Sequence, residues 1–190
     1  MNIWKHLKTI THHKILVAKG CFKVGLYKQG LLHDMSKYSP AEFWVGAKYY
    51  QGTRSPNNAE REDIGYSSAW LHHKGRNKHH YEYWIDYSMQ ALPGGMAPVP
   101  MPDKYIAEMI MDRIAASKVY MGGEYTDRSP LDYYYQGTDR APIHPETKAK
   151  LLYVLEMLAE EGEEKTFRFI KEELVQHKRC MDWHQLEKAE

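Results

Sequence analysis

The chain has 190 residues, most simply one domain that can bury a substantial core. Its 26 basic and 25 acidic residues nearly cancel, so net charge gives no indication of a nucleic acid polymer as partner. Two cysteines, Cys21 and Cys180, cannot form a disulfide framework, and the N-terminus lacks a signal-peptide pattern, so we expect a cytoplasmic protein. The longest uncharged run, residues 87–102, is too short and too rich in proline to span a bilayer, so we expect no membrane partner.

The N-terminal segment has apolar residues at helical spacing, which predicts a helix over residues 3–28. His13 shares the face of this helix that carries Ile10 and Val17, so its imidazole is expected to point into the core. An imidazole on such a face is either a hydrogen-bonded core residue or a metal ligand.

The segments that follow also favour helix. Ser39 and Pro40 are typical of a helix start, with serine as N-cap and proline at the first position. Residues 51–62 are rich in Gly, Pro and Asn, which predicts a loop. Helices are then expected over residues 63–74 and from residue 79 onward.

The second half contains two segments that we expect to be long loops, residues 90–102 and 122–144. Between them lies a helix over residues 103–120, and two further helices are predicted over 145–161 and from residue 163. No strand-like alternation stands out. The sequence therefore predicts an all-α single domain over residues 1–190, with two long loops of the kind that often carry function.

The histidines are concentrated in the first part of the chain. Eight of the 11 lie before residue 81, and six of these form three adjacent pairs, His12–His13, His72–His73 and His79–His80. Imidazole and carboxylate groups are the usual ligands of zinc, iron and manganese. Solvated or capping histidines are the alternative explanation.

Asp112 gives a second indication of a metal site. It lies between Met109 and Ala116 on the face of the 103–120 helix that should be buried. A carboxylate turned toward an apolar interior is costly unless a cation or hydrogen-bond donors meet it. We therefore expect a cation at Asp112.

The string "HDMSK", His33 to Lys37, together with an early histidine and the distant Asp112, resembles the signature of the HD-domain metal-dependent phosphohydrolase superfamily. The overall pattern is most similar to small uncharacterised bacterial and phage proteins allied to it. The resemblance covers the metal-site core, about residues 5–120. Residues 121–190 are then a helical C-terminal extension.

The resemblance implies a ligand set. A first metal would be held by His13, His33, Asp34 and Asp112. Asp34 would bridge to a second metal completed by histidines of the tract "LHHKGRNKHHYEYW", for which we select His73 and His80. The neighbouring histidine of each pair stays open as an alternative.

The same resemblance suggests which residues act on a substrate. Asp34 and Lys37 would be the catalytic residues, and Lys37 could also bind a phosphate, although an ordinary surface lysine is an equal alternative. Arg76 beside the histidine tract and Arg140 in the second long loop are candidates to neutralise substrate phosphate groups.

Three functions are compatible with this pattern. The first is a phosphohydrolase that acts on a nucleotide or another small phosphorylated metabolite through hydroxide activated by one or two divalent metals, for which Fe, Mn, Zn and Ni are candidates. The second is an HD-type di-iron oxygenase, and the third is a non-catalytic helical metal-binding protein. The last helix is also expected to carry an apolar stripe, which allows a homodimer; its residues are Phe167, Ile170, Leu174 and Met181.

Overall fold

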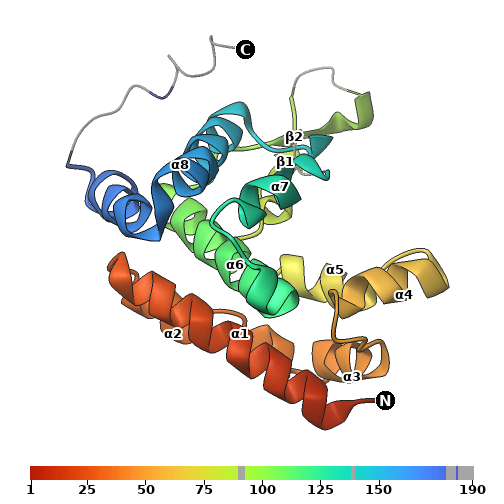
Figure 1. Ribbon diagram of the computed structural model, residues 1–190. Helices are drawn as coiled ribbons and strands as arrows, with labels where there is room; N and C mark the ends of the chain where they lie inside the picture. Colours follow the sequence, from red (N-terminus) through yellow and green to blue (C-terminus); the bar gives the residue numbers. More distant parts are fainter. Residues whose placement is uncertain (90–92, 138–139, 179–182, 184–190) are drawn as a thin grey trace.

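The computed structural model describes residues 1–89, 93–137, 140–178 and 183. Its α-helices in this part of the chain are α1 (Ile3–Lys23), α2 (Tyr27–Leu32), α3 (Pro40–Lys48), α4 (Pro56–Ile64), α5 (Ser68–Lys74), α6 (Asp103–Met121), α7 (Ser129–Tyr135) and α8 (Pro145–Phe169) (Figure 1). A small antiparallel sheet pairs β1 (Ile85–Tyr87) with β2 (Met96–Pro98). Short helical turns complete the fold, at Met35–Tyr38, Tyr81–Tyr83, Pro93–Gly95, Gly122–Glu124 and Ile170–Val175. The prediction of an all-α single domain is confirmed.

Helix α6 is the centre of the fold, with α1 on one side and α7 and α8 on the other (Figure 1). Its buried residues lie all around the helix and include Ile106, Ile110 and Met111. A helix that is apolar on every side is covered on every side. Any polar group on α6 that points inward is therefore held in a fixed place by packing.

The first predicted helix ends earlier than expected. Helix α1 stops at Lys23, and the chain turns at Gly25, whose φ of 89° favours glycine, before α2 begins. His13 is buried on the inner face of α1, as predicted. The N-terminal boundary of α3 at Pro40 is also as predicted.

Several boundaries in the middle of the chain were predicted wrongly. Helix α4 begins at Pro56, inside the expected loop 51–62, and ends at Ile64, so the expected helix 63–74 is divided between α4 and α5. Residues 79–89 form a turn and strand β1 in place of a helix. Local sequence is a weak predictor of loops and of short strands, because tertiary contacts determine which conformation such segments adopt.

The second half shows similar differences. Helix α7 lies within the expected long loop 122–144, and β2 lies within 90–102. Helix α8 continues through Gly162, where φ 80° and ψ 173° make a kink at the expected helix boundary. The last helix was expected to place Met181 on its apolar stripe, and that residue lies outside the described part of the chain.

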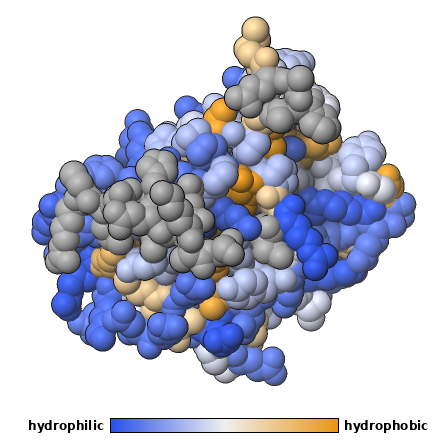
Figure 2. All heavy atoms as spheres, turned by 90° about the horizontal axis from the view of Figure 1, so that it is seen from above, coloured by the Kyte–Doolittle hydropathy of each residue, from blue (hydrophilic) through white to orange (hydrophobic). Residues whose placement is uncertain are grey.

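The face seen from above in Figure 1 is mostly hydrophilic, and its hydrophobic residues form separate small patches (Figure 2). Among the described residues, no helix combines the length and the apolar character needed to cross a bilayer. The longest helix, α8, carries charged residues along its whole length.

The contact between α1 and α3 at Gly46 gives a test of this packing. A Cβ added at Gly46 would overlap the buried imidazole of His6. We expect Gly46→Ala to lower the free energy of unfolding by about 1–3 kcal/mol, which lowers Tm by about 2–4 °C per kcal/mol in a chain of this size. Thermal unfolding followed by circular dichroism measures the change.

Gly123→Ala is the control, because a Cβ there meets no atom within 4 Å. In a His6→Ala background, the loss of unfolding free energy caused by Gly46→Ala should largely disappear. An undiminished cost in that background would show that the two residues do not clash.

Candidate metal centre

The His33–Asp34 pair lies on a tight turn between α2 and the helical turn that follows it. Asp34 has φ 53° and ψ 26°, the left-handed conformation that Asp and Asn adopt more readily than most residues. The Lys14 ammonium on α1 donates to the carbonyl oxygens of Leu31 (2.6 Å) and His33 (2.9 Å), which ties the turn to α1. Both side chains of the pair point inward and are 2% exposed.

The first candidate metal group combines one oxygen of Asp34 with His13, His33 and Asp112. His13 Nε2 lies 2.9 Å from Asp112 Oδ1 and 3.7 Å from Asp34 Oδ2. His33 Nε2 lies 3.3 Å from Asp34 Oδ2 and 3.5 Å from Asp112 Oδ1. Ligand atoms on one metal with bonds near 2.1 Å are about 3–3.5 Å apart, so these four atoms surround a space of the right size.

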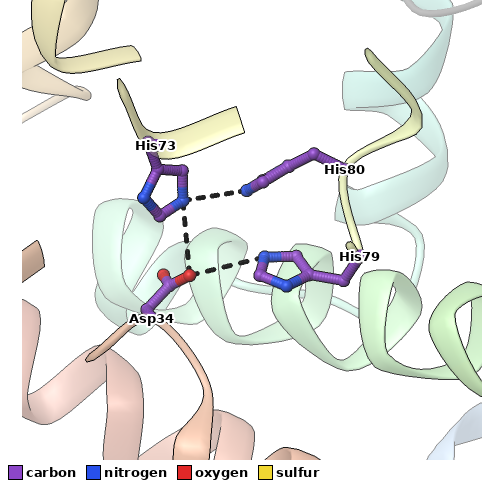
Figure 3. A group of neighbouring side chains, drawn as sticks. All are labelled: Asp34, His73, His79 and His80. Atoms are coloured by element: carbon purple, nitrogen blue, oxygen red, sulfur yellow. Dashed lines mark hydrogen bonds and ion pairs between the residues drawn. The ribbon is translucent and has the colours of Figure 1, made fainter. Parts of the chain in front are cut away.

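The second candidate group uses the other oxygen of Asp34. Asp34 Oδ1 lies 3.3 Å from His73 Nε2 and 3.4 Å from His79 Nε2. His80 approaches from the same segment as His79, and its Nε2 is 2.9 Å from His73 Nε2 (Figure 3). Figure 3 shows the four side chains pointing toward one another from three separate segments. Asp34 therefore belongs to both groups.

Two further buried carboxylates contact the Nδ1 atoms of the imidazoles, on the side of each ring away from Nε2. Glu108, one helical turn before Asp112 on α6, lies 3.0 Å from His33 Nδ1 and 3.3 Å from His79 Nδ1. Glu42 on α3 lies 2.7 Å from His73 Nδ1. A carboxylate at Nδ1 fixes the ring orientation and leaves Nε2 as the lone-pair donor, as is usual for metal-binding histidine.

The buried atoms of the two groups fit a cation. Nε2 of His13, His33 and His79 and both carboxylate oxygens of Asp34 are buried without a hydrogen bond of good geometry, although the Lys37 ammonium pairs with Asp34 Oδ2 at 2.6 Å. Buried polar atoms are nearly always satisfied in native proteins, so these atoms of two adjoining groups need an explanation. One or two metal ions supply it, and the residues present could hold them.

The charges of the groups suit metal binding. Burial alone would favour neutral acids, but neighbouring imidazoles outweigh it, with Lys37 also acting on Asp34, and hold the pKa of Asp34 and of Asp112 well below the usual range. Burial, with His79 and His73 nearby, lowers the pKa of His80, so this imidazole is neutral and can donate its lone pair. Ionised carboxylates and neutral imidazoles are the forms that bind metals. Neighbouring carboxylates, Asp34 first, outweigh burial and raise the pKa of His33 and of His73, so a metal would displace a proton from each of these two imidazoles.

A cavity of about 670 Å³ reaches both groups and is lined by His13, His73, His80 and Asp112. This volume is within the range of small-molecule sites. Lys37 also lines the cavity and lies 2.6 Å from Asp34 Oδ2. Although burial opposes the charge of Lys37, the Asp34 carboxylate raises the pKa of its ammonium above the ordinary value, so it stays positive.

The structure brings together all six residues selected from the sequence as metal ligands, His13, His33, Asp34, His73, His80 and Asp112. It adds His79, so both members of that pair point into the second group. Their backbone is not helical here, since His80 has φ −93° and ψ 129°. The sequence indicated the pair and could not show that both imidazoles converge.

The outer carboxylates were not identified from the sequence. Glu108 lies four residues before Asp112, and this spacing on one helix face was the available signal. For Glu42 we find no comparable local signal, because its partner His73 is 31 residues away.

The two arginines selected for substrate binding lie elsewhere. Arg76 and Arg140 are exposed and are not among the described residues that line the cavity, so their positions give no support to that prediction. Arg113, directly after Asp112, and Arg61 of α4 do line it.

A comparison with protein families finds a match over most of the chain. The model of a family of unknown function (DUF5662) matches residues 2–157, and the chain belongs to that family. The matched range contains every residue of both candidate metal groups. No curated protein and no solved structure matches the chain.

Asp34→Asn tests whether one carboxylate serves both groups. Asparagine keeps the size and tolerates the left-handed backbone, so the fold should be retained while the charge is lost. We expect the affinity for both metals to fall by more than about 100-fold, since the variant removes a ligand from each site. Metal content by mass spectrometry measures this, with the exposed Asp86→Asn on β1 as control. Unchanged metal content in Asp34→Asn would contradict the site.

Glu108 and Glu42 provide a matched pair of variants. Glu108→Gln should weaken both metals, because Glu108 contacts imidazoles of both groups, whereas Glu42→Gln should weaken only the metal held by His73. Loss of such an outer carboxylate typically costs about 10–100-fold in metal affinity. Titration with Co²⁺, followed by its visible absorbance, counts the two sites. If both variants weakened the same number of Co²⁺ sites, the assignment of Glu108 to both groups and of Glu42 to one group would be contradicted.

Proposed function

We propose that this member of the family is a metal-dependent phosphohydrolase that acts on a nucleotide or another small phosphorylated metabolite. One observation carries the proposal: two ligand groups share the Asp34 carboxylate, and members of both groups line one cavity. Two cations so placed would lower the pKa of a shared water and neutralise charge that builds on a phosphoryl group.

The residues around the groups support an anionic substrate. Lys37 and Arg113 both line the cavity next to Asp34 and Asp112, respectively. Once cations balance the carboxylates, these two side chains add positive charge where a phosphate group would approach. Arginine and lysine are the usual partners of phosphate oxygens in proteins.

The cavity also has room for more than a phosphate group. Trp70 lines it, and its ring lies 4.7 Å from the ring of His80, with the Arg61 guanidinium 5.7 Å from the Trp70 ring. This aromatic and cationic wall lies beside the second ligand group. It could contact the organic part of a phosphorylated metabolite while the phosphate lies at the metals.

A panel of phosphate esters and nucleotides tests the proposal with protein loaded separately with Mn²⁺, Fe²⁺, Zn²⁺ and Ni²⁺. We expect phosphate release from at least one substrate and its loss in Asp34→Asn. Fully metal-loaded protein that hydrolyses none of them would contradict the proposal. If its metals then changed only Tm, they would be structural and the protein non-catalytic.

Lys37→Met tests the role of the ammonium. We expect kcat/KM for the active substrate to fall by about 10–100-fold, as for the loss of one hydrogen bond to a charged group. Metal content should be retained, because Lys37 is not a ligand. Lys48→Met on the surface of α3 is the control. A normal kcat/KM in Lys37→Met would show that Lys37 only balances the charge of Asp34.

The donor set supports a second candidate, a di-iron oxygenase. The two groups together supply five imidazoles and two carboxylates, and imidazole-rich sites favour iron or zinc over magnesium. Two bound irons, oxygen consumption with an organic substrate and no phosphate release would favour this function.

A further inference from the structure

The charge of the chain is distributed very unevenly. The first 33 residues contain six lysines and no aspartate or glutamate. All 25 acidic residues of the chain therefore lie after residue 33, together with 20 of its 26 basic residues. A nearly neutral protein thus has a strongly basic end formed by α1 and α2. Such an asymmetry indicates a negatively charged partner for that end.

The same end exposes large apolar side chains. Trp4, Ile15 and Phe22 lie along the side of α1 opposite its buried face, at spacings of 11 and 7 residues. Leu31 and Leu32 at the end of α2 and Met35 after it are also exposed. The exposed fractions run from 39% for Phe22 to 80% for Trp4.

Helices α1 and α2 pack against each other, so their exposed sides adjoin. The ring of Phe22 lies 5.5 Å from that of Tyr27 at the start of α2, and Gly30 of α2 packs against Cys21 and Phe22. We call this surface the α1–α2 face and define it by the six apolar residues above and the exposed lysines of α1 and α2, which are Lys5, Lys8, Lys19, Lys23 and Lys28. Lys14 is excluded, because it holds the Asp34 turn.

The composition of the α1–α2 face argues against other macromolecules. Lysine is depleted in protein interfaces, and two copies meeting through this face would bring ten exposed lysines together without an acidic residue from either α1 or α2. A nucleic acid would use the lysines but gives no reason to expose Leu31, Leu32 and Met35. A bilayer with anionic lipids uses both, because apolar side chains enter the interface while lysines reach the headgroups.

We propose that the α1–α2 face binds the surface of an anionic lipid bilayer. The contact is peripheral: α1 and α2 lie on the membrane, with Trp4 and the Leu31–Leu32 pair inserted to the depth of the headgroups and the lysines around them. It does not depend on the metal centre, which uses the opposite, inner face of α1. The proposal replaces the expectation of no membrane partner, which was based only on the absence of a spanning segment.

Co-sedimentation of the full chain with vesicles tests the proposal. We expect binding to vesicles of phosphatidylcholine mixed with phosphatidylserine, weaker binding at high salt, and little binding to phosphatidylcholine alone. Lys19→Glu with Lys28→Glu should weaken binding by about tenfold or more, since each lysine near an anionic surface contributes several-fold. Leu31→Gln with Leu32→Gln should weaken it by a similar factor while the charge stays the same.

The control is Arg128→Glu with Lys165→Glu, which makes the same change of net charge at two exposed positions, before α7 and after the kink of α8. This variant should bind vesicles like the unchanged protein. Equal loss in both charge variants would overturn the proposal, because net charge alone would then account for binding. A stable dimer that dissociates when Leu31→Gln and Leu32→Gln are introduced would also overturn the proposal. Tight binding to a nucleic acid without binding to vesicles would overturn it as well. All variants change exposed side chains, so circular dichroism and metal content should remain normal.

Discussion

The buried carboxylate of Asp34 is the group on which the arrangement of this protein depends. An ionised acid at 2% exposure is costly unless positive charge or donors surround it. Here imidazoles and a lysine approach its two oxygens from α1, α5, the segment at residues 79–80 and the turn that follows Asp34 itself. Each of these elements must keep its place for the charge to be balanced.

Helix α6 connects this requirement to the hydrophobic core. It carries Asp112 and Glu108 one turn apart on the side that meets the histidines, and apolar residues on its other sides pack against α1, α7 and α8. A carboxylate on a helix that is packed all round has little freedom, which gives ligand atoms a fixed geometry. The packing of α6 in the core therefore also fixes the positions of the metal ligands that it carries.

Helix α1 has two faces with different roles. Its inner face contributes His13 beside Ile10 and Val17, so an apolar stripe and a metal ligand share one side. Its outer face exposes Trp4 and Phe22 among lysines. An ordinary amphipathic helix has a polar outer face, and the departure from that pattern separates α1 from the mostly hydrophilic surface seen in Figure 2.

The sequence by itself determined the helical class and the inward direction of His13 and Asp112. These features are encoded by residue spacing within one helix, and local periodicity is a strong signal. The central place of the His33–Asp34 pair was expected only from its resemblance to the HD-domain signature. Tertiary structure decided the rest. Glu42 and His73 are 31 residues apart and Glu108 and His33 are 75 apart, so only packing brings them together. His79 joins His80 because the backbone there is extended and held by its surroundings, a conformation that no helical spacing predicts.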